Sequence, residues 1–448
     1  MKKVAILGAG ISGLGTSYHL GHEKCEIYEA KSYYGGHCHS ELRDGLYWDE
    51  GPHVSFGKNM YVHEVFAQAT DQDFQEFVPV MANYFRGHWI DHPAQSNLYQ
   101  IPEPLRTACL QSFLEARANG DQQTAPTNYQ EWLHQAFGRV FADTFPAAYT
   151  RKYWTTDPVN LGTDWIAFPS PELPRRTEDK SNTRVYYPAV DDIKDGAHGP
   201  LGRSTNYVTR FRYPSHGGFV TFLRKFADGA RIHYGKDLKT INFRHKTLRF
   251  SDGTETTYDI LVSTIPLPAL IKCSEDAPAD IREAGSVLTC TNFLLVNVVA
   301  NHPTKRKDHW LYVYDEDKLS TRISFVERFS QHNASDSTTG ISVEVYGSEY
   351  RPLPSDHEEV ARKVQSELIE MGLLESLSAV KAVHTRFVPT GNVIFDHNRQ
   401  PALNKIFPFL DSHDVTCLGR YGEWEYLMTH DCVMGSKQIA ENIRQQIL

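Results

Sequence analysis

Short hydrophobic runs alternate with glycine-rich turns at the start of the chain. Residues 3–7 form one such run, which is typical of a strand buried in a parallel sheet. A helical pattern follows up to residue 20, and a second predicted strand covers residues 25–29. This order of strand, glycine-rich turn, helix and strand predicts an α/β fold with a Rossmann-type nucleotide-binding domain.

Further strands of the same kind recur much later in the chain. The hydrophobic pattern predicts strands over residues 232–241 and 260–266, a hairpin around residues 247–253, and a strand near residue 415 followed by a helix over residues 431–447. We therefore expect one discontinuous nucleotide-binding domain made of residues 1–60, 210–270 and 390–448.

The segments between these pieces have different patterns. We expect a helical domain over residues 60–165 and a flexible flap over residues 165–210, which is rich in proline, glycine and charge. Alternating positions predict an antiparallel β-sheet substrate domain over residues 271–389, and residues 358–371 have the pattern of one amphipathic helix. The expected strands are Asn292–Val299, Trp310–Tyr314, Ile323–Val326 and Ile341–Tyr346.

Composition narrows the classes of function. The 448 residues carry a net charge of −9, which argues against a general nucleic-acid binder. The seven cysteines include no CxxC pair, so we expect neither a disulfide framework nor a metal site, and a cytoplasmic location fits. No hydrophobic run is long enough to predict a membrane span. The oligomeric state stays open, with a homo-oligomer among the possibilities.

The first glycine-rich turn has the spacing GxGxxG and is followed about 20 residues later by an acid at the end of the second strand. Glycines here allow a tight turn and close approach of a pyrophosphate, the helix N-terminus attracts phosphate, and Glu29 would bind ribose hydroxyls. The alternative is an ordinary glycine-rich turn. The candidate cofactor contacts are Gly8, Gly10, Ile11, Ser12, Gly13, Glu29 and Ala30.

A Gly-Gly pair follows this acid at residues 35–36. An acid and then Gly-Gly resembles the extended dinucleotide motif of FAD-dependent amine oxidases. That resemblance implies FAD, permanently bound, with Gly36 and His37 beside it.

The next motif, Gly51-Pro52-His53, resembles the GPH stretch of the UDP-galactopyranose mutases. The resemblance implies that Pro52 and His53 lie at the flavin, with His53 near N5 of the ring. A structural histidine at the exit of a turn is the alternative.

The resemblance to this mutase family extends along most of the chain. The segment FPAAYTRKYW resembles the aromatic spacing of the nucleotide-sugar site, which implies roles for Phe145, Tyr149 and Trp154, although the same spacing suits core packing. Arg322 resembles the arginine that binds the diphosphate, with a solvated strand arginine as the alternative. A second diphosphate arginine would come from the flap, where Arg175 and Arg176 are the candidates.

The C-terminal segment is also similar to the family. GRYGEWEY resembles the mutase motif whose last tyrosine, here Tyr426, binds diphosphate. The final helix would direct its N-terminus at the flavin, where its dipole favours the negative charge of the reduced ring; Asp431 could instead be only a helix cap. The flavin contacts implied here and in the middle segment are Leu238, Thr264, Gly419, Arg420, Asp431, Cys432 and Val433.

The resemblance implies a flavin-dependent mutase that interconverts the pyranose and furanose forms of a nucleotide-diphosphate sugar for cell-surface glycan synthesis. N5 of the reduced FAD would be the nucleophile at the anomeric carbon, His53, Arg322 and Trp154 would be the catalytic set, and NADH or NADPH is a candidate external reductant. The alternative is an FAD-dependent amine oxidase or protoporphyrinogen oxidase-like oxidoreductase; a non-catalytic scaffold is a third. Phe387 departs from the mutase pattern, which often has tyrosine there.

Overall fold

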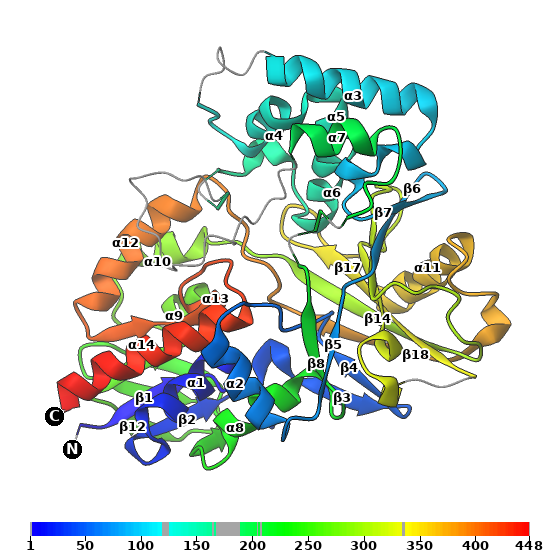
Figure 1. Ribbon diagram of the computed structural model, residues 1–448. Helices are drawn as coiled ribbons and strands as arrows, with labels where there is room; N and C mark the ends of the chain where they lie inside the picture. The colour runs from blue at the N-terminus through cyan, green and yellow to red at the C-terminus, as the bar shows by residue number, and fades with distance from the viewer. Residues whose placement is uncertain are drawn as a thin grey trace.

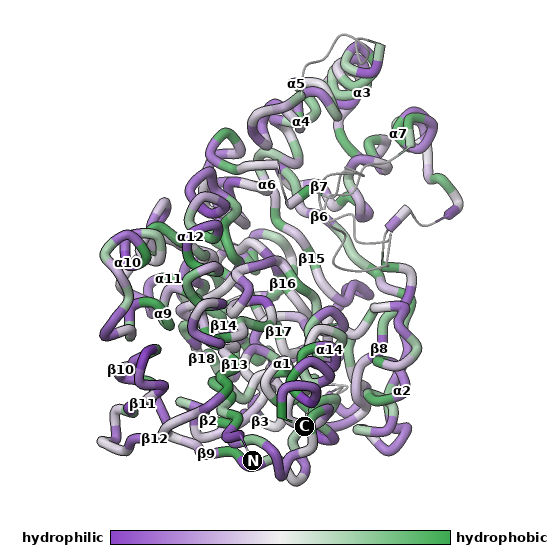
Figure 2. The backbone as a smooth tube through the Cα atoms, turned by 90° about the vertical axis from the view of Figure 1, so that its left-hand side faces the viewer, coloured by the Kyte–Doolittle hydropathy of each residue, from purple (hydrophilic) through white to green (hydrophobic). Residues whose placement is uncertain are grey.

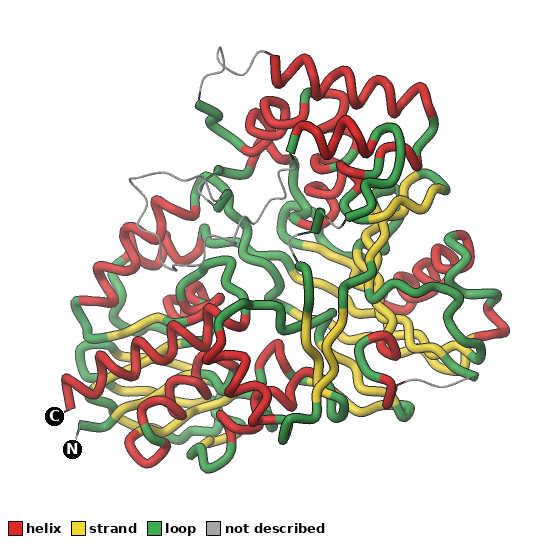
Figure 3. Tube along the Cα trace, viewed as in Figure 1, coloured by secondary structure: helices red, strands yellow, loops and turns green. Residues whose placement is uncertain are grey.

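The computed structural model describes residues 2–118, 125–163, 165–166, 189–203, 205–206, 208–333 and 337–447. Three parts are visible in Figures 1 and 3: a layered α/β part that contains both termini, a large sheet beside it, and a group of helices at the top. This arrangement confirms the predicted α/β fold class. Among the described residues, no helix is both long and apolar enough to cross a membrane.

The α/β part is built on a five-stranded parallel sheet with the order β19-β13-β1-β2-β9. Its strands come from the beginning, the middle and the end of the chain, and the residues of β1 and β13 are fully buried. A buried parallel strand needs hydrophobic residues on both faces, which explains the unbroken apolar runs in the sequence. The strands are β1 (Val4–Leu7), β2 (Cys25–Glu29), β9 (Ile232–Tyr234), β13 (Ile260–Ser263) and β19 (Val415–Cys417).

Two helices from opposite ends of the chain pack together on this sheet. Helix α1 (Ile11–Leu20) lies against α14 (Thr429–Ile447). The contact is close because Gly15 has no side chain: a Cβ there would lie 2.4 Å from the hydroxyl of Ser436. Around the sheet lie β10 (Leu238–Asn242), β11 (Thr247–Phe250), β12 (Glu255–Thr257), α2 (Met60–Ala69), α8 (Arg224–Ala227), α9 (Leu267–Lys272), α10 (Ala279–Ser286), α12 (Arg399–Asp411) and α13 (Gly419–Gly422).

The second sheet has seven strands in the order β18-β14-β17-β16-β15-β6-β7. All neighbouring strands are antiparallel except β15 and β6, which are parallel. The amphipathic helix α11 (His357–Glu370) covers it, close to the predicted bounds. The strands are β6 (Met81–Phe85), β7 (His88–Asp91), β14 (Asn292–Ala300), β15 (Trp310–Val313), β16 (Arg322–Phe325), β17 (Thr339–Gly347) and β18 (Val380–Val388).

Helices α3 to α7 form the third part, which we call the helical lobe. In Figure 2 the colour changes between hydrophobic and hydrophilic along α3, as expected for an outer helix with one face on the core. The lobe comprises α3 (Glu103–Ala118), α4 (Tyr129–Phe137), α5 (Arg139–Thr144), α6 (Pro146–Tyr153) and α7 (Val190–Gly196).

Residues 60–102 differ from the expected helical domain. Helix α2 packs against α8 and α14 of the α/β part, and three strands follow it. Every residue of β6 is buried, so this run serves the large sheet and not a helix face. The remaining short strands are β3 (Ser40–Arg43) with β4 (Leu46–Asp49), and β5 (Phe74–Phe77) with β8 (Phe211–Pro214).

Candidate functional site

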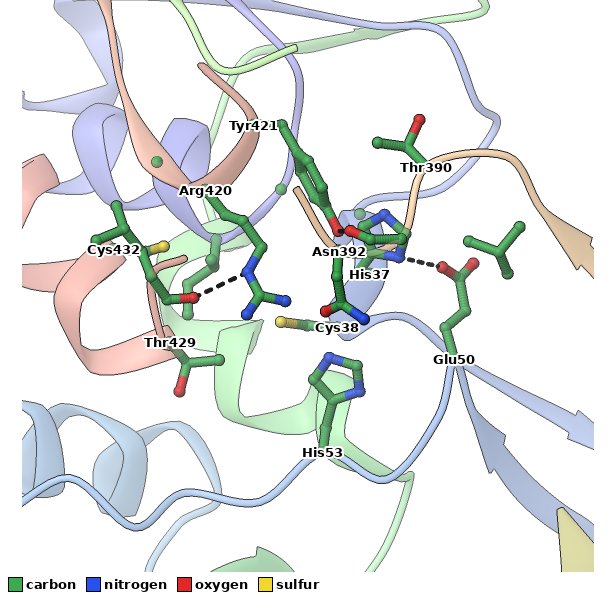
Figure 4. A pocket seen from close by; sticks show the side chains of 18 of the residues that line it. His37, Cys38, Glu50, His53, Thr390, Asn392, Arg420, Tyr421, Thr429 and Cys432 are labelled. Carbon is green, nitrogen blue, oxygen red and sulfur yellow. Dashed lines mark hydrogen bonds and ion pairs between the residues drawn. The ribbon is translucent and has the colours of Figure 1, made fainter. Parts of the chain in front are cut away.

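A cavity of about 680 Å³ lies between the parallel sheet and the large sheet. Its floor is formed by the turn after β1, the segment after β2 and the start of α14, and its roof by β16, β17, β18 and the end of α6. Figure 4 shows the side chains of His53, Arg420 and Asn392 directed into the same space. A cavity of this size is in the range that holds cofactors and other small molecules.

The glycine-rich turn of the floor is shaped by close backbone contacts. Gly8 has a φ of +96°, and a Cβ on Gly13 would lie 2.0 Å from the carbonyl oxygen of Gly8. The Gly-Gly pair lies beside this turn, since a Cβ on Gly36 would be 3.2 Å from the Cα of Gly10. The missing side chains therefore leave bare backbone along the cavity wall at Gly8, Gly10 and Gly36.

Glu29 ends β2 and holds this turn in place. Its buried carboxylate accepts hydrogen bonds from the backbone N–H of Ala9 at 2.7 Å and of Lys31 at 2.8 Å. It also lines the cavity next to Ala30, where lone pairs remain that could accept from ligand hydroxyl groups.

The C-terminal segment completes the floor. Gly419 has a φ of +81°, and a Cβ there would lie 2.1 Å from the hydroxyl of Ser12. The guanidinium of Arg420 lies over the ring of Tyr426 at 4.4 Å and its Nε donates to the carbonyl of Leu427. It has no ion pair with an acidic side chain among the described residues, so Arg420 offers a cation to the cavity.

His53 faces the cavity in a neutral form. Burial lowers the pKa of His53 to about 4, although a hydrogen bond to the carbonyl of Gly51 partly opposes this shift. That bond, 3.0 Å long, needs a hydrogen on Nδ1, so Nε2 is left with a lone pair as an acceptor.

Glu50 is a buried carboxylate surrounded by basic groups. Burial alone would raise its pKa, but the hydrogen bond from His37 at 2.9 Å and the positive charges of Lys31 and Arg386 lower it to about 2. Lys31 is 3.6 Å away, and Arg386 of β18 forms an ion pair with Glu50. Glu50 therefore connects Lys31 and His37 of the floor with Arg386 of the roof.

The roof contains a second buried carboxylate. Arg322 of β16 and Glu344 of β17 are direct neighbours across the sheet and form a bidentate ion pair, with Nη2 and Oε1 2.7 Å apart. Tyr153 stands beside them, and its hydroxyl lies 3.2 Å from both the Tyr426 hydroxyl and the Asn392 side-chain oxygen. The roof is thus rich in hydroxyl groups and close to neutral in charge.

Most of the predicted site residues come together in this cavity. Those that line it are Gly8, Gly10, Ile11, Ser12, Glu29, Ala30, Gly36, His37, Pro52, His53, Thr264, Arg322, Gly419, Arg420, Tyr426 and Cys432.

The three predicted aromatic residues in and next to α6 do not line the cavity. Phe145 is fully buried between Phe85, Phe141 and Tyr314. Tyr149 stacks on Tyr153, and Trp154 packs against Trp165 and Tyr426. In place of these three, Tyr153 reaches the cavity.

Four predicted flavin contacts are also absent from the residues that line the cavity. Gly13 and Val433 are packed beneath it, and Leu238 of β10 accepts a hydrogen bond from the thiol of Cys273 through its carbonyl oxygen. The carboxylate of Asp431, the third residue of α14, accepts a hydrogen bond from the N–H of Met428 before the helix at 2.9 Å, which is the acidic half of a capping box. The two flap arginines, Arg175 and Arg176, lie outside the described residues.

Sequence reasoning missed several residues of the wall: Cys38, Glu50, Tyr153, Tyr312, Glu344, Tyr346, Arg386 and Asn392. Glu50 could have been found, because it directly precedes the Gly-Pro-His motif. Tyr153 stands within the predicted aromatic segment and Cys38 directly follows His37, whereas the others had no local signal. Among the described residues, no group of three or more histidine, cysteine or acidic side chains could hold a metal ion.

Comparison with known families agrees with a cofactor site on the floor of the cavity. The sequence profile of the family described as flavin containing amine oxidoreductase matches residues 11–399. The chain belongs to this flavin-containing amine oxidoreductase family. Membership of this flavin-containing family agrees with the FAD cofactor that the resemblance of the acid and Gly-Gly segment implied.

One known protein is similar in sequence over a short segment, and others are similar in fold. A match to the mitochondrial protoporphyrinogen oxidase of Nicotiana tabacum is 44% identical over 52 residues, which are 11% of this chain and only 10% of that enzyme. A crystal structure of reduced UDP-galactopyranose mutase superposes with a TM-score of 0.89 at 22% identity, covering 100% of this chain and 94% of the other. A protoporphyrinogen oxidase-like protein from Exiguobacterium sp. gives 0.74 at 15% identity, covering 99% of each. At these identities the likeness concerns the fold.

The residues that line the cavity of this chain fit a flavin. The backbone of the glycine-rich turns is exposed along the floor, and Glu29 stands at the end of β2. The N-terminal turn of α14 borders the cavity at Thr429 and Cys432. The backbone N–H groups of that turn and the cation of Arg420 suit a phosphate or an electron-rich ring.

Proposed function

We propose that the protein is a flavin-dependent nucleotide-sugar mutase, similar to UDP-galactopyranose mutase, that interconverts the pyranose and furanose forms of its substrate. The observation that carries the proposal is the side of the cavity opposite the glycine-rich turn: a guanidinium, three tyrosines and an amide face the backbone that suits the flavin. Charged and hydroxyl donors of this kind bind a diphosphate and a sugar. The residues are Arg322, Tyr153, Tyr346, Tyr426 and Asn392.

The two walls would divide the work. The floor would hold FAD, which in its reduced form would supply the nucleophile for the anomeric carbon. Arg322 and Tyr426 bind the diphosphate leaving group and keep it close while the sugar ring changes size. Holding both fragments in one closed space replaces a bimolecular recombination by a step within the site.

The neutral state of His53 supports this assignment. With its hydrogen on Nδ1 and directed at the Gly51 carbonyl, the ring presents only an acceptor to the cavity. It can therefore orient a ligand N–H or O–H group, but it cannot donate a proton from Nε2 near neutral pH.

The second candidate is an oxidoreductase of the same family that acts on an amine or a porphyrinogen. Two buried carboxylates, Glu50 and Glu344, face the cavity and could attract a cationic substrate. Each is already paired with an arginine, which favours the mutase. NADH or NADPH as the reductant remains a prediction.

The test compares both activities in one preparation. We expect the dithionite-reduced protein to convert UDP-galactofuranose, or another furanose nucleotide sugar, to its pyranose form under anaerobic conditions, while the oxidised protein does not. Product is followed by anion-exchange chromatography. Hydrogen peroxide formation with a panel of amines is measured in parallel. Amine oxidation without reduced-flavin-dependent isomerisation of any sugar would mean that the mutase proposal is wrong.

A further inference from the structure

The pairing of Arg322 with Glu344 changes what Arg322 can do. In an antiparallel pair, directly opposed side chains lie on the same face, and here both face the cavity. The side chain of Glu344 is only 2% exposed, against 21% for Arg322. The carboxylate therefore lies beneath the guanidinium, which is the member that a ligand meets first.

The loop that carries His53 packs directly onto this pair. Gly51 has a φ of +83°, and a Cβ there would lie 2.2 Å from Oε1 of Glu344 and 3.5 Å from Nη2 of Arg322. The absence of a side chain at Gly51 thus makes room for the carboxylate. The carbonyl of the same glycine accepts the hydrogen bond from His53, so the ion pair and the histidine share one support.

The bidentate geometry leaves part of the guanidinium free. Arginine has five N–H groups, and the bonds from Nε and Nη2 to Glu344 use two of them. Three remain for a ligand, but the charge that they carry is offset by the carboxylate behind them. An anion on Arg322 is attracted by the guanidinium and repelled by Glu344, and burial strengthens both effects.

We propose that Glu344 sets the strength of anion binding in this cavity: it fixes the orientation of Arg322 and lowers the site's affinity for a diphosphate, so that the ligand is held but can exchange. This rests on the proposed function for the identity of the ligand, but the electrostatic effect applies to any anion on Arg322. Glu344 acts through Arg322 and is a positioning residue.

The test is the substitution Glu344→Gln, which keeps the shape of the side chain and removes its charge. We expect UDP to bind about tenfold more tightly to the flavin-loaded variant than to wild type, and inorganic pyrophosphate to gain similarly, because a repelling unit charge nearby is lost. Uridine, which carries no charge, should bind unchanged. The gain should shrink as ionic strength rises. Equal or weaker binding of both anions by the variant would overturn the proposal.

A matched control is available on the surface. Glu316 forms the same bidentate pair with Arg151, at 2.7 and 2.8 Å, but Glu316 is exposed, Arg151 is only half-buried, and neither lines the cavity. Glu316→Gln should leave anion binding unchanged. An equal gain in this control would mean that net charge, and not Glu344, is responsible.

Loss of one partner of a buried pair can destabilise a protein, so a second comparison keeps the test decisive. Arg322→Met is compared with the double variant Arg322→Met/Glu344→Met, in which neither charge of the pair is left. We expect the double variant to bind pyrophosphate more tightly than the single one; no difference would overturn the proposal. If UDP fails to bind wild type while Glu344→Gln still gains affinity for pyrophosphate, the proposed function fails and the role of Glu344 stands.

Discussion

The floor and the roof of the cavity hold their polar groups in opposite ways. On the floor, backbone is exposed to the ligand because side chains are absent at Gly8, Gly10 and Gly36. On the roof, long side chains reach inward and bind neighbouring side chains, as Arg322 binds Glu344 and Tyr153 binds Tyr426. A site made from backbone suits one cofactor, whereas a site made from side chains can be changed residue by residue. We therefore expect floor variants to lose the flavin and roof variants to change the ligand.

The largest effect should come from the floor. Gly13→Ala places a methyl group 2.0 Å from the carbonyl oxygen of Gly8, so the turn must move. We expect nearly complete loss of bound flavin, measured by the ratio of flavin to protein absorbance. Gly199→Ala is the control, since a Cβ there meets nothing within 4 Å. Normal flavin content in Gly13→Ala would remove this turn from the cofactor site.

Arg322→Ala is the corresponding change in the roof. It removes the guanidinium and leaves Glu344 as an unpaired charge, so we expect UDP affinity to fall by about 10- to 100-fold in titrations while flavin content stays normal. Unchanged UDP affinity would exclude Arg322 from the ligand site, and loss of flavin would contradict the division between floor and roof.

A smaller effect is expected at the hydroxyl of Tyr153. Tyr153→Phe breaks its contacts with Tyr426 and Asn392 but keeps the ring and its stacking. The KM for the nucleotide sugar should rise several-fold with flavin content unchanged, because typical hydrogen bonds contribute about 0.5–1.5 kcal/mol. A KM equal to that of wild type would show that the hydroxyl contacts no substrate.

The neighbouring Tyr149 provides a comparison for Tyr153→Phe. Its hydroxyl is buried with no hydrogen-bond partner in the described part of the chain. Tyr149→Phe removes an unsatisfied group, so the free energy of unfolding should be unchanged or rise by up to about 1 kcal/mol in urea titrations. A clear loss of stability would mean that the hydroxyl has a partner.

The smallest effect concerns pH. Burial holds the pKa of His53 near 4, below the value of about 6.5 of an unfolded chain. Between these values the unfolded chain binds a proton that the folded chain does not, so His53 makes stability fall as pH decreases from 6.5 to 4. The urea midpoint of His53→Gln should therefore fall less between pH 7 and pH 5 than that of wild type. If the urea midpoints of His53→Gln and wild type fell equally between pH 7 and pH 5, His53 would lie in a more polar environment than the structure shows.

The same contrast explains what could be predicted from the sequence. Strand β1, its glycine turn, helix α1 and Glu29 follow one another within thirty residues, so spacing alone predicted them. The roof depends on pairing over distance: Arg322 meets Glu344 through strand register, and Arg386 meets Glu50 from the other end of the chain. Such contacts carry no local pattern. On α6, the aromatic spacing indicated the right helix but not the position along it: Tyr149 and Tyr153 stack on the same face, and of these two only Tyr153, in the last turn, lines the cavity.

Tyr153 also has a consequence for engineering. Among the described residues of the helical lobe from 103 to 163, it is the one that lines the cavity. A library restricted to the last turn of α6 would therefore alter ligand choice without altering a single flavin contact of the floor.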